Sequence, residues 1–94
     1  MARDNDPLLQ PFQLKHLRLR NRILTTSHEP AYPEDGMPKA RYRAYHVERA
    51  RAGVALTMTA GSATVSRDSP PAFNNVLAYR DEVVPWLRDL VDAV

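Results

Sequence analysis

Two stretches of this chain decide its fold: Leu19-Arg-Asn-Arg-Ile-Leu-Thr-Thr-Ser-His-Glu29 and, further along, Gly53-Val-Ala-Leu-Thr-Met-Thr-Ala-Gly61. Each contains a short apolar or β-branched run that ends in small or polar residues, and a helical pattern lies between them. The order strand, loop, helix, strand is that of a βαβ unit, in which the two strands are parallel. Because parallel α/β folds bind ligands at the carboxyl ends of their strands, we expect a site where these two runs end.

The sequence around these stretches predicts the remaining elements. They are a β-hairpin over residues 8–20 with His16 in its turn, a first strand at 23–26, a loop at 27–38, a helix from Pro38 to about Ala52, a strand at 54–59, a loop at 61–80 and a closing helix over 83–94. Residues 1–7 are polar and are expected to form a disordered lead-in, which leaves residues 8–94 as the folded part.

Local signals set the limits of the two predicted helices. Proline suits the first helical turn, so Pro38 is expected to open the first helix, and Gly53 is expected to end it in the left-handed conformation. Asp81 is a suitable cap for the second helix, whose apolar residues recur at helical spacing. On the first helix, small residues are expected to face inward, and His46 is expected to be structural or solvated. These small residues are Ala40, Ala44, Val47 and Ala50.

Composition restricts the functions open to the chain. Its 94 residues form one small domain at most, and the absence of cysteine excludes disulfides, zinc fingers and thiolate nucleophiles within them. The three histidines lack metal-ligand spacing, so no metal site is expected. The amino terminus has no apolar core of a signal peptide, and no apolar run approaches the length of a membrane span. We therefore expect a cytoplasmic protein with no membrane partner.

Positive charge is concentrated in the first half of the chain, because ten of the thirteen Lys and Arg residues lie at or before Arg51. Such a half could attract the phosphate of a nucleic acid or of a nucleotide cofactor. One alternative is therefore a small stand-alone basic α/β protein that binds nucleic acid through residues 15–22 and 39–51, although the chain has no recognised motif for this. Another is a chain that acts only by assembling with other chains along its strand edges.

The residues that follow the first predicted strand are candidates for a site: Thr26, Ser27, His28 and Glu29. His28 and Glu29 are the candidates for catalysis. An imidazole can move protons near neutral pH, and the neighbouring carboxylate could orient it or bind a cationic substrate.

Three further residues extend this candidate site. Ala60 and Gly61 end the second predicted strand, and their small size would let a flat ring approach the backbone. Tyr32, in the loop after the first strand, could line a pocket for a small-molecule substrate. Tyr42 and Tyr45 lie on the predicted helix and are expected to serve in packing.

Taken together, these residues resemble the NADH:flavin oxidoreductase family, also called the Old Yellow Enzyme family, of FMN-dependent (β/α)8 barrels. The likeness covers residues 8–94 and is carried by motifs in a fixed order: Leu8-x-x-Pro-Phe-x-Leu14, Leu19-Arg-Asn-Arg-Ile23, Tyr45-x-x-Glu-Arg-Ala-x-x-Gly53 and Asp81-Glu-x-x-Pro-Trp-Leu87. The segment Thr26-Ser-His-Glu-Pro30 is most similar to the branch that contains trimethylamine dehydrogenase and N-methylproline demethylases.

The resemblance implies a flavin site at the two strand ends. Thr26, Ser27, His28 and Glu29 would line FMN, partly through backbone atoms, and Ala60 or Gly61 would lie near its ring system. Trimethylamine dehydrogenase carries a flavin-linking cysteine where this chain has Glu29, so FMN is expected to bind non-covalently. NAD(P)H is an electron donor consistent with the family. The 4Fe-4S cluster of the larger relatives belongs to a part that these residues do not include.

The resemblance also implies that the chain is the amino-terminal portion of a (β/α)8 barrel. It would form an incomplete barrel, made of the hairpin and the first two β/α units. The parent reaction would be hydride transfer through FMN, in the N-demethylation of an amine or the reduction of an enoate. The isolated chain is expected to be inactive. It is also expected to self-associate, because the side that faces the missing strands stays open.

Overall fold

The computed structural model describes residues 5–59, 62–70 and 74–94, and its centre is a parallel pair of strands. In this pair, β3 (Leu24–Thr25) lies beside β4 (Leu56–Thr57), with Leu24 opposite Leu56 and Thr25 opposite Thr57. Two further backbone bonds, from Ala55 to Ile23 and from Met58 to Thr25, extend the ladder at both ends. The predicted strands at 23–26 and 54–59 are therefore confirmed in place and direction, in shorter form.

The helix that connects these strands is α1 (Ala40–Ala52), and it begins later than predicted. Pro38 is fully buried and precedes the N-cap residue Lys39, so the prediction that Pro38 opens the first turn was wrong. The reason is the preceding turn, in which Glu34 and Met37 exchange two backbone hydrogen bonds of 2.9 Å. At its other end, Gly53 has φ 110° and its N–H reaches the carbonyl of Ala50, which confirms the left-handed helix end.

The buried face of α1 carries aromatic rings rather than the predicted small residues. Tyr42 and His46 are each 3% exposed, whereas Ala40 and Ala44 are exposed to solvent. Both patterns repeat at helical spacing, but the rings remove far more apolar surface from water when they face inward. The predicted inward stripe of small residues was therefore wrong, and of the two roles left open for His46 the structure shows the buried, structural one.

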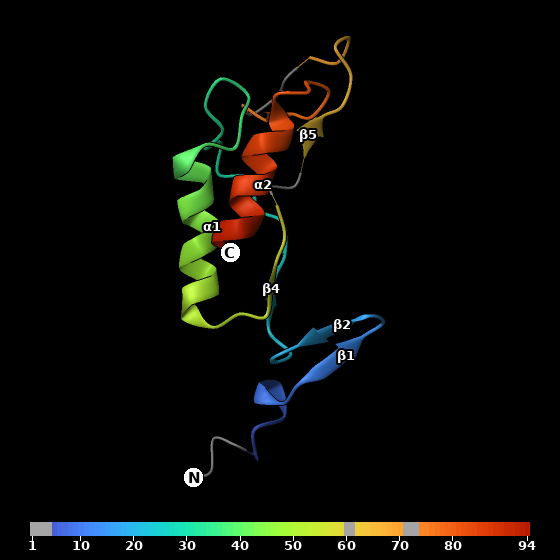
Figure 1. Ribbon diagram of the computed structural model, residues 1–94, viewed down its shortest axis with the longest axis vertical. Helices are drawn as coiled ribbons and strands as arrows, with labels where there is room; N and C mark the ends of the chain where they lie inside the picture. Colours follow the sequence, from blue (N-terminus) through green and yellow to red (C-terminus); the bar gives the residue numbers. More distant parts are fainter. Residues whose placement is uncertain (1–4, 60–61, 71–73) are drawn as a thin grey trace.

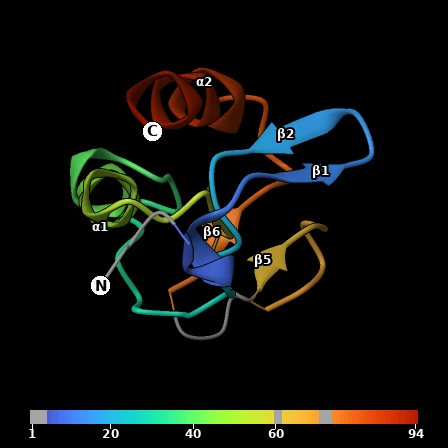
Figure 2. The same ribbon diagram turned by 90° about the horizontal axis from the view of Figure 1, so that it is seen from below.

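A small hydrophobic core lies between the two helices and the second half of the chain. Its buried members are Met37, Tyr42, Val76, Val83 and Leu90, and Tyr32, Leu77 and Trp86 pack against them partly buried. Figure 2 shows α1 and α2 next to each other, with β6 near the middle of the view. The core thus brings together segments that are far apart in the sequence.

The predicted loop at 61–80 contains two short strands that the sequence analysis missed. β5 (Ala63–Thr64) and β6 (Val76–Leu77) pair in parallel, and the side chain of Asn75 donates to the carbonyl of Ser62 at 3.1 Å. Strands of two residues produce no alternation that could be recognised, and the serine and proline content of the segment indicates a loop.

The closing helix is α2 (Val83–Ala93), and its N-cap differs from the prediction. Glu82, not Asp81, occupies the N-cap position, and within the described residues its side chain forms no cap hydrogen bond. Glu82 has helical backbone angles, whereas a capping side chain needs the extended conformation at this position. Asp81 lies in the turn before the helix, and its carbonyl accepts from Val84 at 3.1 Å.

The predicted hairpin forms at one end of the molecule, below the helices in Figure 1. It consists of β1 (Phe12–Leu14) and β2 (Leu17–Leu19), which pair antiparallel after a short 3-10 turn, Pro7–Leu9. Lys15 has φ 52°, so a two-residue turn with His16 is confirmed. Residues 1–4 of the expected lead-in lie outside the described residues.

Side chains that follow the hairpin attach it to the end of α1. Arg20 donates to the carbonyl oxygens of Ala50 and Val54 at 2.9 Å each, and Asn21 donates to the carbonyl of Gly53 at 2.7 Å. Ala50 also accepts from the N–H of Gly53, so the side-chain bonds add to the closure of the helix end and bind the two carbonyls just beyond it. The Leu-Arg-Asn-Arg motif therefore joins the hairpin, α1 and the start of β4.

The molecule is elongated, and much of its apolar surface is uncovered. Its radius of gyration is 15.6 Å, whereas a compact domain of this length is expected to have about 12 Å. Large apolar side chains are exposed on the hairpin and on α2, among them Phe12, Leu14, Leu87 and Val91. Within the described residues, no helix is long and apolar enough to cross a membrane.

A short series of hydrogen bonds ties both central strands to α1. Thr25 Oγ1 donates to Thr57 Oγ1 at 2.9 Å, and Thr57 Oγ1 lies 2.9 Å from Nδ1 of His46. The Thr57 hydroxyl can either donate to Nδ1 or accept from it, depending on the tautomer of His46. Burial, and secondly the charge of Arg49, lower the pKa of His46 below its ordinary value of 6.5.

The lowered pKa of His46 predicts a loss of stability in mild acid. The folded state resists protonation, so the unfolded state binds more protons as the pH falls below 6.5. The stabilising contribution of neutral His46 is thus present above pH 6.5 and is lost as the pH falls toward the folded-state pKa. We expect the melting temperature at fixed protein concentration, followed by circular dichroism, to fall between pH 7.5 and pH 5. The His46→Gln variant should show a smaller change of melting temperature with pH. The His16→Gln variant, altered in the exposed hairpin turn, should keep the full change. If both variants show the same change with pH, His46 is not its cause.

Gly36 predicts a second effect on stability. It has φ 75°, and a Cβ atom there would lie 2.5 Å from two side-chain carbons of Leu77. Gly53 is the matched control, because its φ is 110° and no described atom lies within 4 Å of the added carbon. Both alanine variants strain the backbone, but only Gly36→Ala adds overpacking, which typically costs about 1–3 kcal/mol. We expect Gly36→Ala to melt at least ~4 °C below Gly53→Ala. Equal melting temperatures would mean that Leu77 moves aside without cost.

Candidate functional site

The carboxyl ends of β3 and β4 lie side by side, because the two strands are parallel and in register. Thr26, Ser27 and His28 follow β3 directly and are exposed. Met58 and Thr59 follow β4 and are also exposed. The structure thus brings the predicted residues after β3 next to the end of the neighbouring strand. Ala60 and Gly61, predicted to complete this edge, lie outside the described residues.

The His28 side chain does not stand free, because its ring stacks on Tyr45 of α1. The ring centroids are 6.3 Å apart with an angle of 18° between the planes. Tyr32 also contacts Tyr45, edge to face, at 5.9 Å and 80°. His28 and Tyr32, both predicted to belong to the site, therefore contact the same residue, Tyr45. Tyr45 was predicted to serve only in packing.

Tyr45 itself is fixed from within α1. The guanidinium of Arg49, one helical turn further on, lies 3.5 Å from the centre of the Tyr45 ring, and its Nη1 donates to the Tyr45 carbonyl at 3.1 Å. The Tyr45 ring also contacts His46 edge to face at 5.2 Å. The spacing of Tyr45 and Arg49 by four residues is a sequence signal for this contact.

Glu29 carries an oxygen that lacks a partner. Its Oε1 accepts from the N–H of Ala31 at 3.1 Å, which fixes the carboxylate against the loop. Its Oε2 is buried, and within the described residues it has no hydrogen-bond donor. A buried carboxylate oxygen needs a donor, so this atom fits an N–H or O–H group of a ligand.

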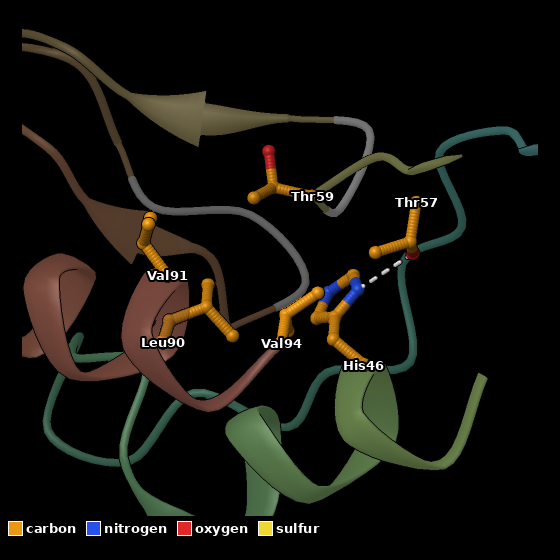
Figure 3. Close-up of a pocket in the computed structure, with 6 residues that line it drawn as sticks. All are labelled: His46, Thr57, Thr59, Leu90, Val91 and Val94. Atoms are coloured by element: carbon orange, nitrogen blue, oxygen red, sulfur yellow. Dashed lines mark hydrogen bonds between the residues drawn. The ribbon is translucent and has the colours of Figure 1, made fainter. Parts of the chain in front are cut away.

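Two hollows with apolar walls flank β4 on the side of α2. One, of about 210 Å³, lies between His46, Thr57 and the end of α2, and Figure 3 shows the imidazole between Thr57 and Val94. The other, of about 200 Å³, is lined by residues that include Tyr42, Thr59 and Leu87. Both are lined in part by apolar side chains of α2.

The basic residues of the first half are largely engaged within the chain. Arg41 lies over the ring of Tyr32 at 4.1 Å, and Arg20 is bonded to backbone carbonyls. Lys39 and Arg43 are close to carboxylates. The described part of the chain thus gives no support to the nucleic-acid alternative. It also contains no cluster of three His, Cys, Asp or Glu side chains that could hold a metal ion.

Comparison with known proteins agrees with this geometry. A probable N-methylproline demethylase of Rhizobium meliloti (strain 1021) is 80% identical over 90 residues, and a multifunctional alkene reductase/demethylase OYE of Caballeronia cordobensis is 49% identical over 90 residues. An N,N-dimethylglycine/sarcosine dehydrogenase of Chromohalobacter salexigens is 37% identical over 91 residues. These alignments cover 95–96% of this chain but only 13% of each relative.

The resemblance inferred from the sequence motifs is therefore confirmed, including its demethylase branch. The sequence model of the NADH:flavin oxidoreductase / NADH oxidase family matches residues 7–94, which is nearly the whole chain. With its parallel strand pair and the polar segment that follows β3, this chain belongs to the NADH:flavin oxidoreductase / NADH oxidase family.

Proposed function

We propose that this chain is the amino-terminal part of an FMN-dependent oxidoreductase. The observation that carries the proposal is the parallel β3–α1–β4 unit, which presents an exposed polar segment at its strand ends in a chain of this family. The relatives are far longer than the stretch they share with this chain, so the activity belongs to a larger protein.

The proposed architecture is a (β/α)8 barrel, to which the chain contributes the hairpin and the first two β/α units. The uncovered apolar surface supports it, because Leu87 and Val91 of α2 are exposed beside the hollows along β4. Parallel strands are stable when both faces and both edges are covered. Further strands and helices of a barrel would supply that cover.

The residues at the strand ends fit FMN. Thr26 and Ser27 are exposed, and their backbone groups would bind the cofactor, while the unpartnered Oε2 of Glu29 would accept from one of its N–H or O–H donors. The absence of cysteine from these residues excludes a cysteinyl bond between FMN and this segment. When bound, FMN supplies the hydride transfer, and the protein supplies placement and electrostatics. A nicotinamide donor and any 4Fe-4S cluster would be held by the remainder of the protein.

Oxidation of an N-methylated amine is the reaction we favour, with reduction of an activated alkene as the second candidate. The names of all three relatives state either an N-methylated amine substrate or a demethylase activity. One of the three is also named an alkene reductase. Loss of a hydride from the N-methyl group gives an iminium, which water hydrolyses to the demethylated amine and formaldehyde. His28 and Glu29 are the residues of this chain that could hold a proton or a cationic amine there.

The full-length protein tests this assignment. We expect it to be purified with FMN that remains in solution after acid precipitation of the protein, because no cysteine of this segment can retain it. With N-methylproline and an added electron acceptor that reoxidises FMN it should release formaldehyde, and with an activated alkene and NAD(P)H as the electron donor it should show lower turnover. The 94-residue chain alone should cause no saturable quenching of FMN fluorescence at micromolar concentration. A colourless full-length protein would contradict the proposal, and a tightly bound flavin on the short chain would contradict its fragment status.

The isolated chain should also fail to behave as a stable monomer. Its exposed apolar residues on the hairpin and α2, together with the open edge of the β3–β4 pair, favour contacts between copies. We expect light scattering to show a mass that rises with concentration, and denaturation followed at Trp86 to depend on concentration. A cooperative, concentration-independent transition of a monomer would instead indicate a self-sufficient domain.

A further inference from the structure

Tyr45 occupies an unusual place on α1. It is half-buried, whereas the core positions of the helix are held by Tyr42 and His46, which are each 3% exposed. Its ring meets His28 and Tyr32, both from the segment that follows β3. Tyr45 therefore contacts both rings of this segment, while Arg41 of the same helix lies over Tyr32 alone at 4.1 Å.

The segment from His28 to Tyr32 needs such a contact. It contains no helix or strand, and Ala31 within it has φ 60°, a conformation that alanine rarely adopts. An exposed imidazole on such a segment has several rotamers of similar energy unless a neighbouring surface selects one. The nearly parallel ring of Tyr45 provides that surface for His28, and its edge-to-face contact does the same for Tyr32.

Arg49 restricts the movement of the Tyr45 side chain. Its guanidinium covers the tyrosine ring at 3.5 Å and is anchored to the Tyr45 carbonyl by a 3.1 Å hydrogen bond. A cation on an aromatic face restricts how the ring can turn. The Tyr45 ring thus has contacts within α1, to Arg49 and His46, in addition to those with the loop.

We propose that Tyr45 is a positioning residue that holds His28 and Tyr32 at the carboxyl end of β3, in the orientation in which this end receives its ligand. The inference rests on the proposed flavin-dependent function. It goes beyond that function by assigning a role to a residue on the helix that need not touch the ligand. The aromatic ring performs the role, and the phenolic hydroxyl is not required.

Three variants in the full-length protein separate positioning from general packing. Tyr45→Phe keeps the ring, Tyr45→Leu removes it, and Tyr79→Leu is the matched control. Tyr79 is also half-buried beside two arginines, but it lies in the segment before α2. The first readout is the rate at which diethyl pyrocarbonate modifies His28, measured by mass spectrometry against His16 in the exposed hairpin turn. The second is the dissociation constant of FMN.

We expect Tyr45→Leu to raise the modification rate of His28 toward that of His16 and to weaken FMN binding roughly two- to tenfold, the range expected for loss of one aromatic pair. Tyr45→Phe and Tyr79→Leu should stay within about twofold of the unsubstituted protein on both readouts. Unchanged His28 reactivity in Tyr45→Leu would overturn the inference, and so would an equal effect of Tyr45→Phe.

The remaining outcomes are also decisive. If Tyr45→Leu does not fold, Tyr45→Met replaces it, and failure of both would make Tyr45 a core residue and overturn the inference. If the unsubstituted protein does not bind FMN, the proposed function fails, while the reactivity of His28 still decides the role of Tyr45. If His28 reactivity changes and FMN affinity does not, the contact between Tyr45 and His28 serves packing alone. That result would overturn the positioning role assigned to Tyr45.

Discussion

The hydrogen bonds from Thr25 through Thr57 to His46 are the constraint on which the rest of this structure depends. They join β3, β4 and α1 at one point, so the two strands and the helix that connects them have a single relative placement. His46 is buried and the two threonines are half-buried, so loss of either threonine hydroxyl would weaken the bonding of the buried imidazole. The ligand end of β3 begins one residue beyond this point, and its position follows from these bonds.

Much of the fold could be predicted, because hydrophobic runs and turn residues act locally. The hairpin, the two central strands and both helices have patterns long enough to recognise, and Gly53 marks a helix end through its own conformation. Errors arose where a distant contact decides the outcome. The alanines and the aromatic residues of α1 share the same period, and only the presence of α2 and β4 determines which set is buried. The β5–β6 pair is too short to show any period.

The site was predictable as a position along the strands and less so as an arrangement of side chains. The general rule for parallel sheets places Thr26 to Glu29 at the strand end. It does not indicate that His28 turns toward α1, because that depends on where Tyr45 is held in space. The buried, unpartnered oxygen of Glu29 is likewise a property of the folded loop and has no sequence signature.

The attachment of the hairpin to the end of α1 has a consequence for the order of folding. Arg20 and Asn21 donate to carbonyls at and just beyond the end of α1, which lie 30 to 34 residues further along the chain. A helix can nucleate by itself within a microsecond, but closing a loop of this length adds an entropic cost before the contact is gained. The end of α1 is closed by its own backbone bond from Gly53 to Ala50, so we expect the helix to form before these long-range bonds do. The hairpin is thus attached to a helix end that already exists, and its placement depends on that end.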